Sequence, residues 1–265
     1  MYFDVTKNDN SPIICNVPHS DTSVPEEFKG DFLLSPEALN HEVLYMADNY
    51  TNLLYGELLY VSSSIISKIS RVVLDIERFE NEEDELMSKV GMSALYTRTS
   101  SGSPLRTLGV ENAEKLRRIY KDYHDSFTEL TRNTLINHGM ALIVDCHSFP
   151  SIPRQYEPEQ ESNRPDICIG VDAYHTPEVL VDALRKSFEE VGYSVEINTP
   201  FAGSIVPTLF YKQDKRVVSV MIEVNRKLYM DEETFEKSKN FSQVSKTISR
   251  CVIVMLNHYK ENLTK

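Results

Sequence analysis

Three side chains able to do chemistry lie at the ends of short apolar runs or within them. His19 follows the run 13–17, His147 follows the run 141–144, and Glu223 lies inside the stretch "VSVMIEVNR". Zinc hydrolases take imidazole and carboxylate ligands from separate segments, leave one position open for water, and lower the pKa of that water to about 7. A further carboxylate can accept the proton. The two histidines and the glutamate therefore suggest a metal-dependent hydrolase.

Spacing alone does not separate this chemistry from a structural role. A single histidine after a strand is more often a hydrogen-bonded loop or core residue than a ligand, and the sequence has no HExxH zinc motif. Cys146 cannot easily form a dyad with His147, because neighbouring residues on a strand point to opposite faces. The four cysteines lie far apart without a CxxC pair, so we expect reduced core residues and neither disulfides nor a thiolate zinc site.

Composition limits the classes of protein and partner. The chain has 265 residues, of which 41% are hydrophobic and 26% charged, and we expect one domain over residues 1–265. A formal net charge of −12 repels phosphate backbones and anionic membrane surfaces, so neither nucleic acid nor membrane is an expected partner. Without a long apolar stretch or a secretion signal at the start, we expect a cytoplasmic protein.

The elements that must position the three side chains alternate between strands and helices. Short β-branched runs predict strands over residues 13–17, 71–76, 141–145, 193–197 and 217–224. Apolar residues at helical spacing predict helices over residues 36–58, about 116–138, 177–191 and about 232–259. This order predicts an α/β three-layer sandwich, in which a mixed, mostly parallel sheet is flanked by helices and ligands bind beyond the carboxyl ends of strands.

Longer motifs resemble a known family. In order along the chain, "VPHS", "SRVVLDIERFENEEDE", "GMSALYTRTSSG", "IVDCHSFP", "RPDICIG", "PFAGSIVP" and "SVMIEVNRKLYMDE" resemble the N-formylglutamate amidohydrolase family, from about residue 12 to 235. The resemblance implies a single domain with a fold similar to that of the zinc carboxypeptidases. It also implies hydrolysis of the formyl amide of N-formyl-L-glutamate to formate and L-glutamate, as in histidine degradation.

The resemblance also implies roles for the three side chains. His19 of "VPHS" and His147 of "DCHS" would be ligands of zinc or of another divalent transition metal. Glu223 of "MIEVNR" would be the general base that takes a proton from the attacking water and passes it to the departing amine. The expected partner is thus a small, anionic N-acyl amino acid.

The third metal ligand is where the sequence departs from the carboxypeptidase pattern. That pattern places a carboxylate three residues after the first histidine, but here the position holds Thr22. Asp48, expected on the helix that follows the His19 loop, is our first choice, and Asp21 and Asp145 are substitutes. Asp145 has a second interpretation, as a hydrogen-bond acceptor that orients a ligand histidine.

Arginines are expected at the site because the implied substrate carries two carboxylates and develops an oxyanion. A guanidinium group fits a carboxylate and can stabilise an oxyanion. Arg78, Arg98 and Arg226 lie in the family-like motifs, with Arg71 and Arg106 as further candidates. We expect Arg78 to hold the oxyanion and the others to bind substrate, although a surface salt bridge is an equal alternative for each.

Two further residues have weaker signals. Gly203 in "PFAGS" is expected to allow a positive φ or a close approach of the chain to a ligand, so it could line the pocket. His124 shares a helical stripe with apolar residues, which favours a packed, hydrogen-bonded helix residue.

Two other functions stay open at this point. One is a related zinc amidase for another N-acyl amino acid or a short peptide, since arginines that bind carboxylates do not select the acyl group. A constricted pocket would favour deformylation and a wide one this alternative. The other is a non-catalytic binder of an acidic ligand, although the presence of His19, His147 and Glu223 together disfavours it.

Overall fold

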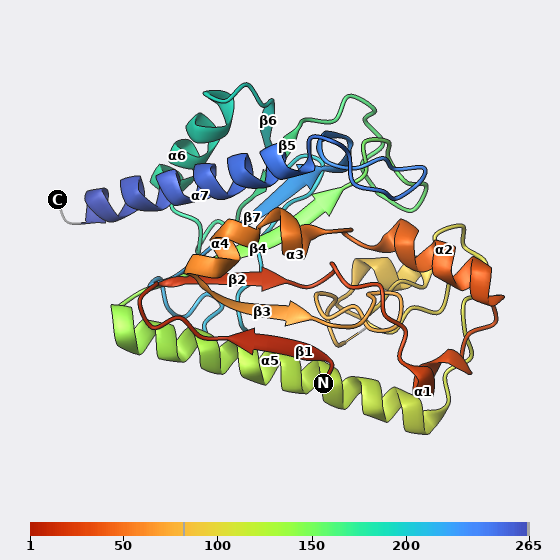
Figure 1. Cartoon of the computed structure of the whole chain (residues 1–265). Coiled ribbons are helices and arrows are strands. Elements are labelled where there is room, and N and C mark those ends of the chain that lie inside the picture. The colour runs from red at the N-terminus through yellow and green to blue at the C-terminus, as the bar shows by residue number, and fades with distance from the viewer. Residues whose placement is uncertain (82, 264–265) are drawn as a thin grey trace.

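A seven-stranded mixed sheet forms the centre of the protein in the computed structural model, which describes residues 1–81 and 83–263 (Figure 1). The strand order is β1-β3-β2-β4-β7-β5-β6. The strands are β1 (Phe3–Thr6), β2 (Ile13–Val17), β3 (Ser63–Ser67), β4 (Ala141–Phe149), β5 (Ile167–Gly170), β6 (Val195–Ile197) and β7 (Val217–Asn225). Neighbouring strands are parallel except at β1–β3 and β5–β7, which confirms the predicted mixed, mostly parallel sheet.

Helices cover both faces of this sheet. Figure 1 shows α5 along one face and α6 and α7 across the other. The α-helices are α1 (Glu26–Lys29), α2 (Pro36–Met46), α3 (Thr51–Leu54), α4 (Gly56–Val61), α5 (Val110–His138), α6 (Glu178–Glu189) and α7 (Phe241–Leu263), with 3₁₀ helices at Leu86–Val90 and Arg226–Leu228. The predicted α/β sandwich of three layers is therefore confirmed. Among the described residues, no helix is both long and apolar enough to cross a bilayer.

The two faces of the central strands have separate cores. Leu142, Val144 and Cys146 pack into the layer of α6 and α7, whereas Ala141 and Ile143 face α5. All nine residues of β4 are buried, as expected for a parallel strand with helices on both sides. Because successive side chains point to opposite faces, the α5 face of β4 continues through residues 145 and 147 toward the carboxyl end.

The predicted strand over residues 71–76 is wrong. Those residues form successive turns, in which the backbone N–H groups of Val73 and Leu74 donate to the Ser70 carbonyl, and the strand beside β2 is instead β3. The run is buried, so its apolar character reports contact with the core and not an extended backbone. The serines of β3 hid that strand, while β1 and β5 were missed because they are short.

The predicted helix over residues 36–58 is interrupted. Helix α2 ends at Met46, Ala47 is extended, and Tyr50 has a φ of 68° before α3 begins. Both α2 and α3 pack on apolar cores, so the helical spacing continues through the gap. Asp48 therefore lies in the interruption and not on a helix, and its backbone N–H donates to the His19 carbonyl.

The other predicted helices are present with changed ends, and α5 begins at Val110, before the predicted start near residue 116. Helix α5 ends where Gly139 takes a φ of 72°, the left-handed conformation that a C-terminal glycine supplies. Helix α6 ends before Gly192, as expected. The last helix begins at Phe241 and not near residue 232, because residues 226–240 form a 3₁₀ turn, an isolated bridge and turns.

Candidate active site

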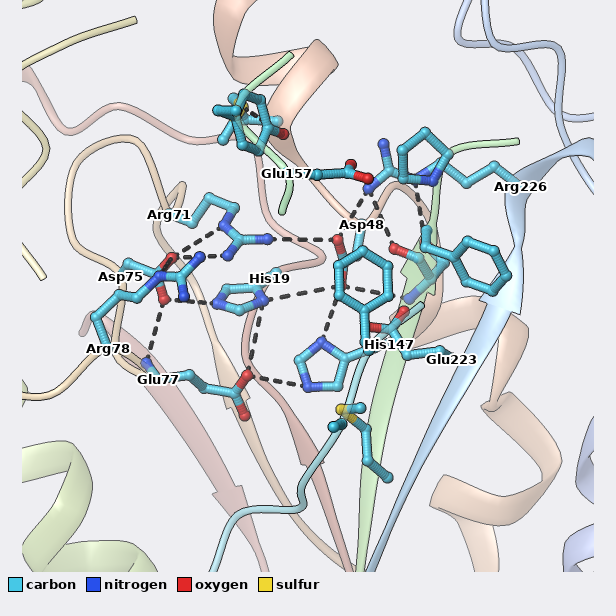
Figure 2. A pocket seen from close by; sticks show the side chains of 18 residues that line it. His19, Asp48, Arg71, Asp75, Glu77, Arg78, His147, Glu157, Glu223 and Arg226 are labelled. Atoms are coloured by element: carbon cyan, nitrogen blue, oxygen red, sulfur yellow. Dashed lines mark hydrogen bonds and ion pairs between the residues drawn. The ribbon is translucent and has the colours of Figure 1, made fainter. Parts of the chain in front are cut away.

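A cavity of about 260 Å³ lies at the carboxyl ends of β2, β4 and β7 (Figure 2). The loop after β2 brings His19 to this cavity, and β4 and β7 bring His147 and Glu223, which are register partners on neighbouring strands. All three side chains are buried. Asp145, His147 and Glu223 are found at this edge because the α5 face of each strand stops being apolar there.

His19 presents one nitrogen to the cavity and uses the other for support. Its Nε2 lies 2.8 Å from Asp75 Oδ1, while Nδ1 is buried without a hydrogen-bond partner. Two carboxylate oxygens face Nδ1, Asp48 Oδ2 at 3.7 Å and Glu77 Oε2 at 3.9 Å. A histidine held through one nitrogen by an aspartate, with the other nitrogen free, is the usual arrangement of a metal ligand.

His147 is surrounded by carboxylates. Its Nδ1 lies 3.0 Å from Asp48 Oδ2, and its Nε2 lies 3.0 Å from both Asp145 Oδ1 and Glu77 Oε2. Burial opposes protonation of the imidazole, but Glu77 and Asp145 outweigh it and raise the pKa of His147 well above its usual value. The concentration of negative charge around the two histidines favours a cation at this point, whether protons or a metal ion.

One group of residues has the composition and spacing of a metal site. His19, Glu77 and His147 offer ligand atoms that all lie within 4.8 Å of one another. Two imidazoles and a carboxylate form a ligand set suited to zinc and related divalent metals. The Nδ1 of His19 fits such an ion, since among the described residues this buried nitrogen has no hydrogen-bond partner.

Glu77 is a candidate metal ligand that sequence reasoning missed. It lies next to Arg78 in "DIERF", within turns whose residues 71–76 have the apolar character of a strand. The available signal was a pair of acidic residues two positions apart, Asp75 and Glu77, directly after an apolar run. Nothing in that pattern separates a half-buried carboxylate that faces two histidines from a solvated one.

Asp48, the predicted third ligand, is in the same cavity but in a different environment. Arg226 Nη2 donates to its Oδ1 at 3.0 Å, and Arg71 Nη1 lies 3.7 Å away. Burial opposes ionisation, but hydrogen bonds from the histidines and the attraction of Arg226 hold the pKa of Asp48 well below its usual value. For Glu77, burial and repulsion from Asp145 raise the pKa.

The substitutes for the third ligand differ in position. Asp145 contacts His147 Nε2 and accepts a hydrogen bond from Asn16. Asp21 does not line the cavity and its Oδ1 accepts from the backbone N–H of Ser23. Asp145 and Glu77 thus share His147 Nε2, whereas Asp48 contacts Nδ1. If Nε2 binds a metal, the contact expected of a residue that orients the ligand histidine is that of Asp48.

Comparison with known proteins gives the family. The sequence profile described as N-formylglutamate amidohydrolase matches residues 11–230. The chain belongs to this family. The predicted membership and the prediction of an enzyme, an amidohydrolase, are therefore confirmed. No curated protein matches the sequence at a significant level.

Solved structures of similar fold agree with the family. The crystal structure of an N-formylglutamate amidohydrolase from Ralstonia eutropha JMP134 has a TM-score of 0.83 and 22% sequence identity, covering 98% of this chain and 99% of that one. The gene product Atu2144 from Agrobacterium tumefaciens has a TM-score of 0.68 and 17% identity, covering 98% and 95%. At these sequence identities, the two structures show that this chain has the same fold.

The predicted arginines of the amidohydrolase fall into two groups. Arg71, Arg78 and Arg226 line the cavity. Arg98 is exposed outside it and donates to the Gly102 carbonyl. Arg106 is buried behind the cavity and donates to the carbonyls of Tyr96 and Val73, so it holds together the turns that carry Asp75 and Glu77.

Donor use separates the three arginines that line the cavity. Arg71 donates through Nε and Nη2 to Asp75 Oδ2, and Arg226 donates to Asp48 and to the Ser148 and Tyr45 carbonyls. The guanidinium of Arg78 makes no hydrogen bond to the described residues and has only ion pairs, at 3.6 Å with Asp75 and 3.7 Å with Glu85. Arg78 therefore has the most donors free for a ligand.

Three other residues considered from the sequence, Gly203, His124 and Cys146, do not line the cavity. Gly203 has a φ of 93° but does not line the cavity, where Phe201 and Ala202 of the same loop do. His124 lies on α5 with Nε2 2.8 Å from the Ile76 carbonyl, as expected for a packed helix residue. Cys146 is buried in the core on the other face of β4, so it does not face the cavity.

Proposed function

We propose that this amidohydrolase depends on a metal, with zinc as the expected ion, and cleaves the formyl amide of N-formyl-L-glutamate to formate and L-glutamate. The observation that carries the proposal is the buried, unpaired Nδ1 of His19, which faces Glu77 and His147 in a cavity that also holds Glu223 and three arginines. Family membership supports the substrate. The reaction would belong to histidine degradation.

We propose His19, Glu77 and His147 as the residues that hold the metal. Asp75 and Asp48 would fix the two imidazoles through their other nitrogens. The bound ion would supply Lewis-acid chemistry, because it acidifies water and polarises a carbonyl group. Asp48 as a ligand stays the competing prediction, since its Oδ2 also faces both histidines.

Glu223 has the properties of a general base. Burial raises its pKa to about 8, and its Oε2 is buried without a hydrogen-bond partner. A carboxylate with a pKa near the working pH accepts a proton readily and gives it up again. We propose that Glu223 takes a proton from the attacking water and delivers it to the nitrogen of the departing glutamate.

The three arginines that line the cavity have different proposed roles. In Figure 2, Arg78 and Glu223 lie on opposite sides of the two histidines, while the guanidinium of Arg71 lies between Asp75 and Asp48. We therefore propose that Arg78, with its free donors, binds a substrate carboxylate, and that Arg71 stabilises the oxyanion. This exchanges the role predicted for Arg78 from the sequence. Arg226 would act mainly by fixing Asp48.

A related N-acyl amino acid is the second candidate substrate. Phe149, Pro150, Phe201 and Met221 line part of the cavity, and this apolar wall gives an acyl group larger than formyl something to pack against. Deformylation predicts a small contribution from this wall, whereas hydrolysis of a larger acyl group predicts a large one.

The deciding experiment measures both substrate and metal. Release of formate from N-formylglutamate is compared with hydrolysis of N-acetylglutamate and N-formylaspartate, with metal analysis of the same sample. The proposal expects one bound metal per chain, loss of activity on chelation, and the highest kcat/KM for N-formylglutamate. The Glu223→Gln protein, prepared identically, is the control for contaminating hydrolases. Full activity without a metal would overturn the mechanism, and preference for the acetyl compound would overturn the substrate.

A further inference from the structure

Asn16 contacts Glu77, one of the proposed metal ligands, without lining the cavity. It is fully buried on β2, and its register partner on β4 is Asp145. Its Nδ2 donates to Glu77 Oε1 at 2.7 Å and to Asp145 Oδ1 at 2.8 Å. Its Oδ1 accepts from the hydroxyl of Tyr123, on α5, at 2.5 Å. One amide thus joins a strand, a helix and the turn that carries Glu77.

The chemistry of the amide fixes its direction. A carboxamide has two N–H donors on one end and an acceptor on the other. Both donors of Asn16 are used by carboxylates, and the acceptor is used by Tyr123. If the amide were reversed, its oxygen would face two anions and its NH₂ group would face the tyrosine hydroxyl. The two carboxylates, which only accept, therefore keep the donor end toward Glu77 and Asp145, and the hydrogen bond from Tyr123 supports this orientation.

The hydrogen bond from Asn16 to Glu77 Oε1 determines where Oε2, the other oxygen of Glu77, lies. Glu77 lies in turns, whereas Asn16 and Asp145 lie on neighbouring strands of the sheet. With Oε1 held by Asn16, Oε2 lies 3.0 Å from His147 Nε2 and 3.9 Å from His19 Nδ1. The same amide lies between Glu77 and Asp145, which repel each other.

Other buried amides in the protein have a different set of partners. The NH₂ group of Asn225 donates to the Pro165 carbonyl, and that of Asn49 donates to the carbonyls of Leu44 and Ala47. Those bonds satisfy backbone groups of nearby turns. The side-chain amide of Asn16 bonds only to side chains, two of which are acidic groups that touch His147.

We propose that Asn16 is a positioning residue for Glu77, the proposed metal ligand, and that the hydrogen bond from Tyr123 helps to hold the Asn16 amide in place. This inference rests on the proposed function, because it takes Glu77 as a ligand. Asn16 would hold Glu77 so that one oxygen points at the metal and the other at the sheet. It would thereby raise metal affinity without touching metal or substrate.

The test measures zinc affinity of the metal-free full chain by competition with a chromophoric chelator. Asn16→Leu, which keeps the shape of the side chain, should weaken zinc binding by about 10- to 100-fold. Tyr123→Phe should weaken it by about fivefold, the effect of one hydrogen bond. Thr131→Val on the same helix is the matched control, because its hydroxyl bonds only to the Phe127 carbonyl, and its affinity should not change.

A second background separates positioning from general loss of structure. In Glu77→Gln protein, Asn16→Leu should cause little further loss of affinity, since the ligand it positions is already altered. Wild-type affinity in Asn16→Leu, or an equal loss in both backgrounds, would overturn the inference. If Asn16→Leu does not fold, Tyr123→Phe decides, and an unchanged affinity there overturns it. Wild-type protein that binds no zinc would remove the proposed function as well, which distinguishes the two failures.

Discussion

Two carboxylates, Asp48 and Glu77, face Nδ1 of His19 from different segments of the chain. Asp48 comes from the interruption between α2 and α3, where Arg226 and Arg71 match its charge. Glu77 comes from the turns after β3, and among the described residues no lysine or arginine forms an ion pair with it. Asp48, whose charge two arginines already balance, is therefore suited to orient a ligand histidine. Glu77, which pairs with no arginine or lysine among the described residues, is suited to bind a metal cation.

The largest expected effect is on kcat, and it comes from Glu223 and not from Asp48 or Glu77. It separates proton transfer from metal binding. Glu223→Gln should lower kcat by a factor of about 10² to 10⁴, because an amide cannot accept the proton of water. Its metal content should stay at the wild-type level. Stopped-flow or steady-state assays with metal analysis check both. A kcat within a fewfold of wild type would assign the base to another residue.

Matched amide substitutions compare the two carboxylates as ligands. Glu77→Gln should weaken zinc affinity by more than about 100-fold, whereas Asp48→Asn should cost about 10- to 100-fold, the range for a residue that orients a ligand. Chelator competition on metal-free protein measures both. If Asp48→Asn causes the greater loss, Asp48 is the ligand and the comparison is reversed.

The stability of the metal-free protein should respond in opposite ways. Asp48→Asn leaves the buried Arg226 without its carboxylate, and we expect a loss of about 3 kcal/mol in the free energy of unfolding. Glu77→Gln removes an anion that Asp145 repels, so its stability should stay within about 1 kcal/mol of wild type or exceed it. Urea denaturation checks both values. Equal losses would show that the environments do not differ as described.

The smallest effect is a change of stability with pH. Glu223 has a folded-state pKa of about 8, raised by burial above its usual 4.5, so its contribution is fully present below pH 4.5 and is lost as pH rises through about 8. From pH 6 to 8, metal-free wild type should therefore lose about 2 kcal/mol relative to Glu223→Gln. Denaturation of both proteins at each pH measures the difference. A constant difference would contradict the raised pKa.

The periodicity of apolar residues predicts much of the fold. The predictions that are wrong share one cause. The central strands β2, β4 and β7 and the helices α5 and α6 were predicted because their burial is regular along the chain. The turns at 71–76 and the interruption at 47–50 are equally apolar or equally periodic, but tertiary contacts decide their backbone. One example is the hydrogen bond from the Asp48 backbone to the His19 carbonyl.

Some residues of the candidate site can likewise be predicted from the sequence, and others cannot. His19, His147 and Glu223 could be expected at one sheet edge because parallel strands bring their carboxyl ends together. Glu77, the environment of Asp48 and the free donors of Arg78 could not, since each depends on which charges meet across segments far apart in sequence. Arg98 shows the reverse case, where a family-like motif places an arginine on an exposed turn.

The interruption between α2 and α3 also sets a limit on how this enzyme can be stabilised. Tyr50 adopts the left-handed backbone, which costs an ordinary residue about 1–2 kcal/mol, and its hydroxyl is tied to the Phe235 carbonyl. A sequence redesigned to join α2 and α3 into one helix would remove this strain and gain backbone hydrogen bonds. The same change would rotate Asp48 away from His147, so thermal stability and turnover should oppose each other along this segment.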